Sequence, residues 1–519
     1  MRKGLLPLSL ASILLLSTSA GAGMFDSNGY PSKGKAIDAF KPAKDYSDVL
    51  KGRPLALGIM RTRGQGFVPS RELHDYVHGV MMRLLAGVPL PPSFQPDIRV
   101  LATPEFGGEC TPDGTMIVTV GLLEQLETED ELAFVMGHEL SHAILRHSQP
   151  DWAKKSQYFA VVHGTAVDVV AQGAQATIGG HAGANVLRGL DVAQHLAKLS
   201  ANVLMPQMSK GQEDQADALG FDLMVKAGYD PVAPLAVMDK LAQQEAEAAA
   251  SAEAAKQAAQ KNKGSSSSSG GGFMDKLGGG LNIVGTLAAG GRPSTDQLTD
   301  IAIFAFDAAV DNMAEDATTH YPATVRADLL SNYMYATYRD TAPVSPTPLP
   351  WAAESKSPLK PNLIALLSHY TDAENASAYV ADANQGSAAA AAGQVQRSTA
   401  APTSDHAYTA YVAAEYYDTR NPKLSEAALV RATQSPEPSW EVYAKLTDIY
   451  ISRHDYPHAQ SLMDQAVIRF EDSPVLLPKR IQLYRLEGRD SDAQALVPKC
   501  KSYDIDELTD ACKKEAGKG

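Results

Sequence analysis

Apolar residues recur at helical spacing over residues 73–85, and this period predicts a first helix that begins near Ser70. Residues 98–101 have the composition of a short strand. After an Asp-Gly turn signal, the β-rich residues 116–120 predict a second strand. The first part of the chain is therefore expected to combine helices with a small sheet.

A second helical run of apolar residues covers residues 132–145, after a short helix predicted from leucines at 122–126. Thr128 lies three residues before Glu131, and this spacing predicts a capping box at the start of the helix. Mostly helical pattern continues over residues 155–230.

Segments of biased composition divide the rest of the chain. Residues 241–290 are an insertion, Ala-rich at first and then Ser/Gly-rich, which indicates a solvated helix followed by a flexible linker. Helical pattern returns at residues 297–312. Residues 341–403 are rich in Pro and then in Ala, and we expect a linker region with the domain boundary there.

The C-terminal part, residues 404–519, has a 34-residue period, which is that of tetratricopeptide repeats. The matching positions are Tyr416, Tyr450 and Tyr484; Ala432, Ala466 and Cys500; and Ala459 with Ala493. His454 and Gly488 fall at the predicted turns between paired helices. The alternative is an all-α domain with accidental periodicity. The expected fold class is α+β: a mostly helical domain with a small β-sheet, followed by an all-α tetratricopeptide-like repeat domain.

The N-terminus has the three parts of a secretory signal peptide. Arg2 and Lys3 precede an apolar run at residues 5–16, and the small residues 20–22 form a cleavage site. We therefore expect residues 1–22 to be a signal peptide, with an uncleaved anchor as the alternative. No later apolar stretch is long enough to span a membrane, so a periplasmic location is expected, with association to the outer membrane as a further hypothesis.

Cysteine usage and charge add two expectations. An oxidising compartment favours a Cys500–Cys512 disulfide, which leaves Cys110 as the odd thiol; three free buried thiols are the alternative. The formal net charge of -14 argues against nucleic acid as a partner, because binding many phosphates needs a basic surface.

The candidate chemistry lies within the helix over residues 132–145. His138 and His142 are four residues apart, so both imidazoles can face one metal ion. Glu139 can then take a proton from a water molecule that the metal activates. A string of this kind arises by chance in unrelated chains, and a surface-helix motif is the alternative.

A catalytic zinc ion needs a third protein ligand. His147 lies five residues beyond His142, where a continuing helix would turn it away from the metal. Glu213 and Asp217, four apart on a later helix, remain. One can ligate zinc while the other holds a ligand imidazole by its second nitrogen.

These motifs resemble the zinc-peptidase family that includes the CAAX prenyl protease. The segment from Gly121 to His147 looks like its zinc helix, the Glu213–Gly220 segment resembles its ExxADxxG element, and residues 320–326 resemble its HP…R element, with Tyr321 inserted. The resemblance implies a zinc metallopeptidase domain over residues 23–340. In it His138, His142 and Glu213 bind one zinc ion, Glu139 is the general base and Asp217 orients a ligand histidine. It also places His320 and Arg326 near the site, with His320 as a removable plug on the zinc.

The combination with C-terminal repeats is similar to the periplasmic β-barrel assembly-enhancing proteases. It implies a zinc endopeptidase that cleaves misfolded or unassembled envelope proteins, with the repeats binding the outer-membrane assembly machinery. The alternative is a chaperone or assembly factor with a largely plugged zinc site. The strand over residues 116–120 is expected to bind an extended substrate through Met116 and Val118, with ordinary sheet pairing as the alternative.

Overall fold

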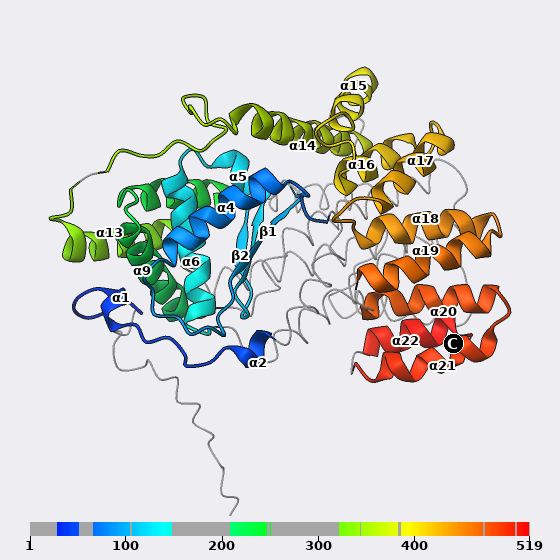
Figure 1. The fold of residues 1–519 in the computed structure, drawn as a ribbon, viewed down its shortest axis with the longest axis horizontal. Helices are drawn as coiled ribbons and strands as arrows, with labels where there is room; N and C mark the ends of the chain where they lie inside the picture. Colours follow the sequence, from blue (N-terminus) through cyan, green and yellow to red (C-terminus); the bar gives the residue numbers. More distant parts are fainter. Residues whose placement is uncertain are drawn as a thin grey trace, which may run out of the picture.

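The computed structural model describes residues 29–50, 66–103, 106–147, 208–246, 250, 321–342, 344–381, 386–470, 473–503 and 506–517. Its first part is a helical layer against a small sheet, and its second part is a curved stack of helices that begins at α14 (Figure 1). The expected mostly helical architecture with a small sheet is confirmed. None of the described helices is both long and apolar enough to cross a membrane.

The sheet has three strands in the order β1-β3-β2: β1 (Asp97–Leu101), β2 (Gly108–Cys110) and β3 (Thr115–Thr119). β3 pairs in parallel with β1 and antiparallel with β2. The turn between β2 and β3 uses Gly114 with φ +84°, a conformation that suits glycine. Asp113 accepts a hydrogen bond of 2.8 Å from the Thr115 hydroxyl and fixes the turn. The sequence predicted β1, β3 and this turn, but not β2.

Three helices contact the sheet, and the last of them carries the two candidate histidines and Glu139. α4 (Arg71–Leu84) begins after its cap Ser70, as predicted, and α5 (Val120–Gln125) follows β3 directly. α6 (Glu129–Ile144) is capped by Thr128, which accepts the backbone N–H of Glu131. The Glu131 carboxylate accepts from Glu127 N instead of from Thr128, so only half of the predicted capping box forms.

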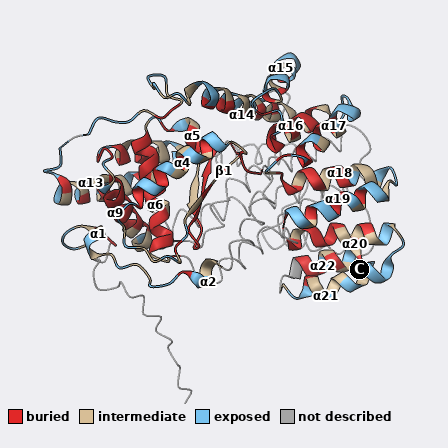
Figure 2. Cartoon of the chain, in the orientation of Figure 1, coloured by how far each residue is buried: buried red, intermediate tan, exposed pale blue. Residues whose placement is uncertain are grey.

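Two further helices complete this part. α9 (Lys210–Lys226) has a full capping box made by Ser209 and Gln212, and packs along α6. α13 (Ala323–Tyr338) packs on α9. Most of the residues of α6 and α9 are buried (Figure 2).

The N-terminal arm, residues 29–50, packs across these helices. It contains α1 (Ala36–Ala39) and α2 (Ser47–Leu50). The N–H of Ile37 donates to Asp222 in α9, and the Tyr46 hydroxyl donates to the carbonyl of Ile144 at the end of α6. The arm thereby ties α9 to the helix that carries the histidines.

The linker expected over residues 341–403 is helical over much of its length. It contains α14 (Lys360–Ala381) and α15 (Ala388–Ser398). Alanine is the best helix former, so the Ala-rich composition taken to indicate a linker favours α15 instead. The Trp351 indole donates to the carbonyl of Leu123 and Thr371 donates to Glu124, which anchors this region to α5.

The C-terminal part consists of helix pairs. The pairs are α16 (Ala407–Tyr417) with α17 (Pro422–Thr433), α18 (Trp440–Ser452) with α19 (Tyr456–Arg469), and α20 (Leu477–Leu486) with α21 (Asp490–Lys501). The short helix η3 (Pro474–Leu476) and the helix α22 (Asp506–Glu515) complete the stack. Ala432, Ala466 and Cys500 are all fully buried, so the 34-residue period marks equivalent packing positions. His454 and Gly488 both have positive φ at the turns inside their pairs. That these pairs are tetratricopeptide repeats stays a prediction.

The predicted Cys500–Cys512 disulfide is confirmed, and it joins α21 to α22. Cys110 is a buried free thiol. Several expectations fall outside the described residues: the signal peptide 1–22, most of the insertion 241–290, the helical pattern at 297–312, and His320.

Candidate metal centre

The candidate centre lies where α6 crosses α9. The two helices approach closely because Gly137 and Gly220 have no side chains: a Cβ on Gly137 would lie 2.8 Å from the carbonyl oxygen of Gly220. His138 follows Gly137 directly. The crossing therefore places a histidine of one helix against the face of the other that carries the acidic residues.

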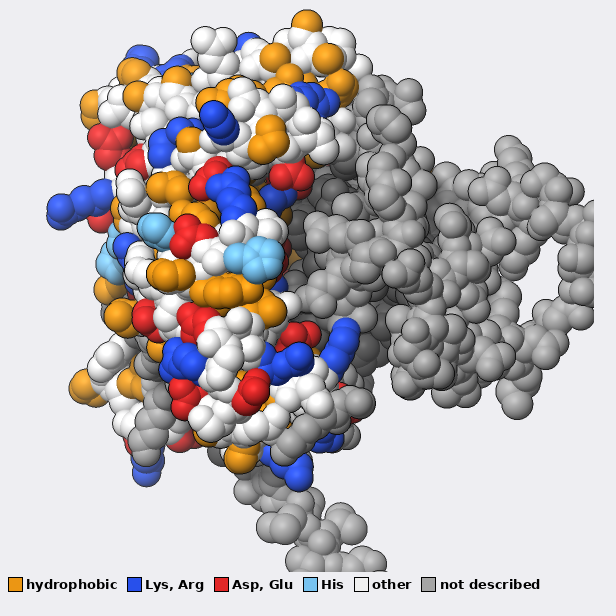
Figure 3. Space-filling view, turned by 90° about the vertical axis from the view of Figure 1, so that its right-hand side faces the viewer, with side chains coloured by type: hydrophobic (Ala, Val, Ile, Leu, Met, Phe, Trp, Pro, Cys, Tyr) orange, Lys and Arg blue, Asp and Glu red, His pale blue; other side chains and the backbone are white. Residues whose placement is uncertain are grey.

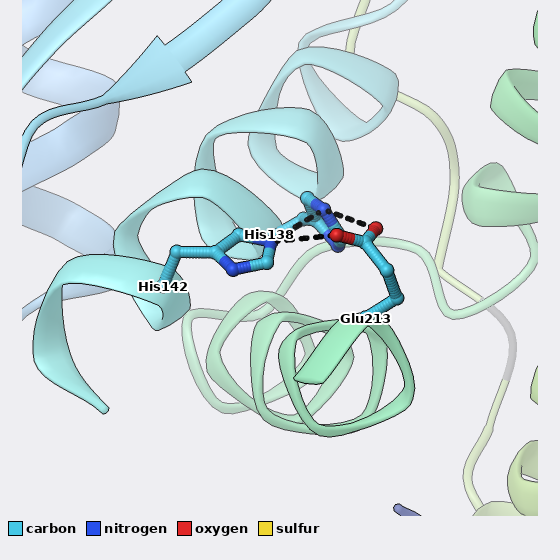
Figure 4. Close-up of side chains that lie close together, drawn as sticks. All are labelled: His138, His142 and Glu213. Atoms are coloured by element: carbon cyan, nitrogen blue, oxygen red, sulfur yellow. Dashed lines mark hydrogen bonds and ion pairs between the residues drawn. The ribbon is translucent and has the colours of Figure 1, made fainter. Parts of the chain in front are cut away.

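His138, His142 and Glu213 converge at this crossing (Figure 4). The two Nε2 atoms are 3.1 Å apart, and each lies 3.6 Å from an oxygen of the Glu213 carboxylate. Ligand atoms at 2.0–2.1 Å from one tetrahedral zinc ion lie about 3.3 Å apart, so this donor set fits such an ion. All three side chains are buried.

Asp217 and Arg326 hold His138 from behind. The Nδ1 of His138 lies 2.9 Å from Asp217, so His138 donates there and its Nε2 faces the site. Arg326, from α13, donates two hydrogen bonds to Asp217, of 3.0 and 2.7 Å. Burial alone would raise the pKa of Asp217, but Arg326 and His138 outweigh it and lower that pKa to about 2. Asp217 therefore stays ionised and orients the imidazole.

His147 also belongs to this centre, which sequence reasoning missed. It is not among the three converging groups, but its Nδ1 lies 3.0 Å from the Nδ1 of His142. Its Nε2 lies 3.1 Å from Oε1 of Gln215, in α9. Burial lowers the pKa of His147 to about 4, so this imidazole is neutral at pH 7. The only signal in the sequence was its nearness to the histidine pair.

The side chain of Glu139, in α6, faces β2 of the sheet. A Cβ on Gly108, in β2, would lie 3.7 Å from the Cγ of Glu139. Burial raises the pKa of the Glu139 carboxyl to about 7; His138 opposes this shift, and the carboxylates of Glu213 and Glu109 add to it. A carboxyl group with a pKa near neutrality suits both proton uptake and proton return.

The placement of Met116 and Val118 argues against a role in substrate pairing. Both lie in β3, whose two edges are taken by β1 and β2, and both are fully buried. An extended peptide therefore has no free edge on this strand. Within the described part of the chain, the sheet edge beside Glu139 belongs to β2.

Comparison with known proteins agrees with this centre. Residues 70–327 match the model of peptidase family M48, and this range includes every residue of the candidate centre. This segment of the chain, just under half of its length, therefore resembles a peptidase family.

Individual relatives match over shorter segments. The chain is 28% identical over 152 residues to "Mitochondrial metalloendopeptidase OMA1" of Arabidopsis thaliana, which is 29% of this chain and 27% of the relative. It is 27% identical over 192 residues to the protein of the same name from Schizosaccharomyces pombe, 36% of this chain and 50% of the relative. It is 31% identical over 134 residues to "Metalloprotease LoiP" of Escherichia coli, 26% of this chain and 46% of the relative. The chain thus spans half or less of the length of each of these relatives.

Proposed function

We propose that this chain is a zinc-dependent endopeptidase that hydrolyses peptide bonds of protein substrates. The observation that carries the proposal is the convergence of His138, His142 and Glu213 beside the partly buried carboxyl group of Glu139. The match to a peptidase family model and the similarity to proteins named metalloendopeptidases support it.

The chemistry follows from the arrangement of these side chains. His138, His142 and Glu213 would hold a zinc ion, which would supply Lewis acidity toward a peptide carbonyl and a water molecule. Glu139 takes the proton of the attacking water and returns it to the leaving amine nitrogen. Asp217 and Arg326 keep His138 in one orientation throughout, so that the donor set does not need to reorganise.

The substrate is proposed to bind in extended form along β2. This strand is short, lies at the edge of the sheet and passes beside Glu139. A peptide that adds to a sheet edge is held by its main chain, so a wide range of sequences can be accepted. This suits an enzyme that removes misfolded or unassembled proteins.

The location is proposed to be the periplasm. The order of basic, apolar and small residues in residues 1–22 supports export, and the Cys500–Cys512 disulfide is expected in an oxidising compartment.

The helix pairs from α16 to α21 are proposed to be tetratricopeptide-like repeats that bind envelope partners, including the outer-membrane assembly machinery. On the face drawn in Figure 3, acidic and basic side chains are interspersed with hydrophobic ones, which suits a protein partner.

Cleavage of an unfolded protein such as casein by the purified chain tests the proposal. Glu139→Gln is expected to lower kcat at least 100-fold, because general-base catalysis contributes about 10²–10⁴, while zinc content stays unchanged. Glu354→Gln, an exposed change outside the site, serves as the control and should cleave like the wild type. A chelator should abolish cleavage, and zinc should restore it.

The proposal fails if the Glu139→Gln variant cleaves at the wild-type rate. A further outcome is that the purified wild type cleaves casein while the Glu139→Gln variant still performs the full function of the protein in cells. In that case proteolysis is not the main role of the protein. The assembly-factor alternative would then be favoured.

A further inference from the structure

The helix that carries the two histidines ends in a tight left-handed turn at Arg146. α6 ends at Ile144, and Arg146 adopts φ 56°, in the left-handed region. The N–H of His147 consequently donates to the carbonyl of His142 over 2.9 Å. This turn brings His147 back alongside the last turn of α6 and not onward along its axis.

Arg146 is held in this unfavourable conformation by the N-terminal arm. Its guanidinium pairs with Asp48 and donates to the carbonyl of Asp45, and it lies over the ring of Tyr46 at 5.7 Å. A left-handed conformation is costly for a residue other than glycine, and these three contacts hold Arg146 in it. Its effect here is to aim His147 at His142.

The hydrogen-bond pattern fixes which atoms carry protons. Nδ1 of His142 faces Nδ1 of His147 at 3.0 Å, and Nε2 of His147 faces the Gln215 amide oxygen at 3.1 Å. An amide oxygen only accepts, so His147 donates through Nε2 and its Nδ1 is an acceptor. His142 must then donate through Nδ1, which leaves the lone pair on its Nε2 directed at Glu213 and His138.

We propose that His147 is a positioning residue that fixes the ring orientation and the tautomer of His142, and that Gln215 in turn fixes His147. The proposal rests on the metal site proposed above. It assigns three tasks to one short segment of α9: Glu213 completes the donor set, Asp217 holds His138, and Gln215 holds His142 through His147. The two histidines are thus held by different groups, one by a carboxylate and one by a neutral imidazole.

Zinc affinity, measured by competition with a chromophoric chelator, tests the proposal. His147→Phe keeps a ring but removes the acceptor, and is expected to weaken zinc binding by about 10–100-fold, as is usual when a group that orients a ligand is lost. His147→Asn places an amide oxygen close to where Nδ1 lies, and should restore most of the affinity. The melting temperature of each variant in chelator shows whether the metal-free fold is retained.

Gln215 provides an independent pair of variants. Gln215→Met removes the acceptor for Nε2–H and should weaken zinc binding, whereas Gln215→Glu keeps an acceptor and should bind zinc at least as tightly as the wild type. This pair decides the matter if His147→Phe does not fold.

Wild-type affinity in His147→Phe would overturn the proposal, and so would an Asn variant no better than Phe or equal affinities in the two Gln215 variants. These outcomes are distinct from failure of the proposed function. That failure would appear as a wild-type protein that binds no zinc, or as Glu139→Gln with full peptidase activity.

Discussion

Gly137 and Gly220 are in backbone contact at the crossing of α6 and α9. A Cβ on Gly220 would lie 2.5 Å from the backbone nitrogen of His138 and 2.7 Å from the carbonyl carbon of Gly137. Neither helix can move aside alone, because His138 is held by Asp217 and α9 is held by the N-terminal arm. The distance between the histidines and Glu213 therefore depends on two glycines that carry no chemistry.

Gly220→Ala is expected to destabilise the protein and to weaken its metal site. The added methyl group must push the helix backbones apart, and overpacking of this kind costs about 1–3 kcal/mol. Urea unfolding in chelator measures the loss of stability, and zinc competition measures the effect on the site.

Gly211→Ala is the matched control for this change. It lies in the same helix, and a Cβ there meets nothing within 4 Å. Because alanine favours a helix over glycine by up to about 1 kcal/mol, this variant should be as stable as the wild type or more stable. Equal stability of the two variants would show that the helices do not touch at Gly220.

Arg326→Met is expected to lower the free energy of unfolding by about 3–5 kcal/mol, because it leaves the fully buried charge of Asp217 without its cation. Adding Asp217→Asn removes that charge and should recover part of the stability. Zinc affinity should not recover in the double variant, because the Asp217 carboxylate that holds His138 is lost. Urea unfolding of both single variants and the double variant, with zinc affinity measured in parallel, separates the two effects. If the two changes lower the free energy of unfolding by amounts that add, Arg326 and Asp217 do not interact directly.

The sequence could predict the chemistry of the centre because its spacing is helical. His138 and His142 share a face of α6, and Glu213 and Asp217 share a face of α9, so the helical period alone indicates which side chains can act together. The position of His147 could not be predicted in this way. It depends on the left-handed turn at Arg146, and nothing in the local pattern requires a non-glycine residue to adopt that conformation.

Two errors in the fold have similarly local causes. β2 has only three residues and no alternation of polar and apolar positions, so it gives no strand signal, and without it β3 was taken to have a free edge. The helices within residues 341–403 were not predicted either, although the alanines of α15 favour a helix; the domain boundary in this span stays a prediction. The plug role of His320 stays a prediction.

The Cys500–Cys512 bond is expected to stabilise the C-terminal end of the helix stack specifically. Both sulfurs lie in a small buried cluster with Leu477, Ile481 and Leu508, separate from the main core. The two cysteines are 12 residues apart, and closing a loop of this size contributes about 3 kcal/mol in the chain-entropy model.

Hydrogen exchange with and without reductant tests this. Reduction should speed exchange in α21 and α22 and leave α6 and α9 unchanged. The Cys500→Ala/Cys512→Ala double variant should resemble the reduced wild type and no longer respond to reductant. Faster exchange throughout the chain would mean that the bond supports the whole fold and not its last helices.

The buried imidazole of His406 is expected to make stability depend on pH. Its Nδ1 lies within hydrogen-bond distance of the Tyr370 hydroxyl, at 2.9 Å, and burial lowers its pKa from 6.5 to about 4. Between these values the unfolded chain binds more protons than the folded one, so the free energy of unfolding should fall by about 2 kcal/mol from pH 7 to pH 5 on account of this group. His406→Asn keeps an acceptor for Tyr370 but cannot be protonated in this range, and urea unfolding at both pH values should show a smaller loss by about that amount. His454→Asn, which removes an exposed imidazole at a position with φ 60° that asparagine tolerates, is the matched control and should keep the wild-type pH dependence. If His406→Asn and the wild type lose equal stability on acidification, the ring of His406 is not buried in its neutral form.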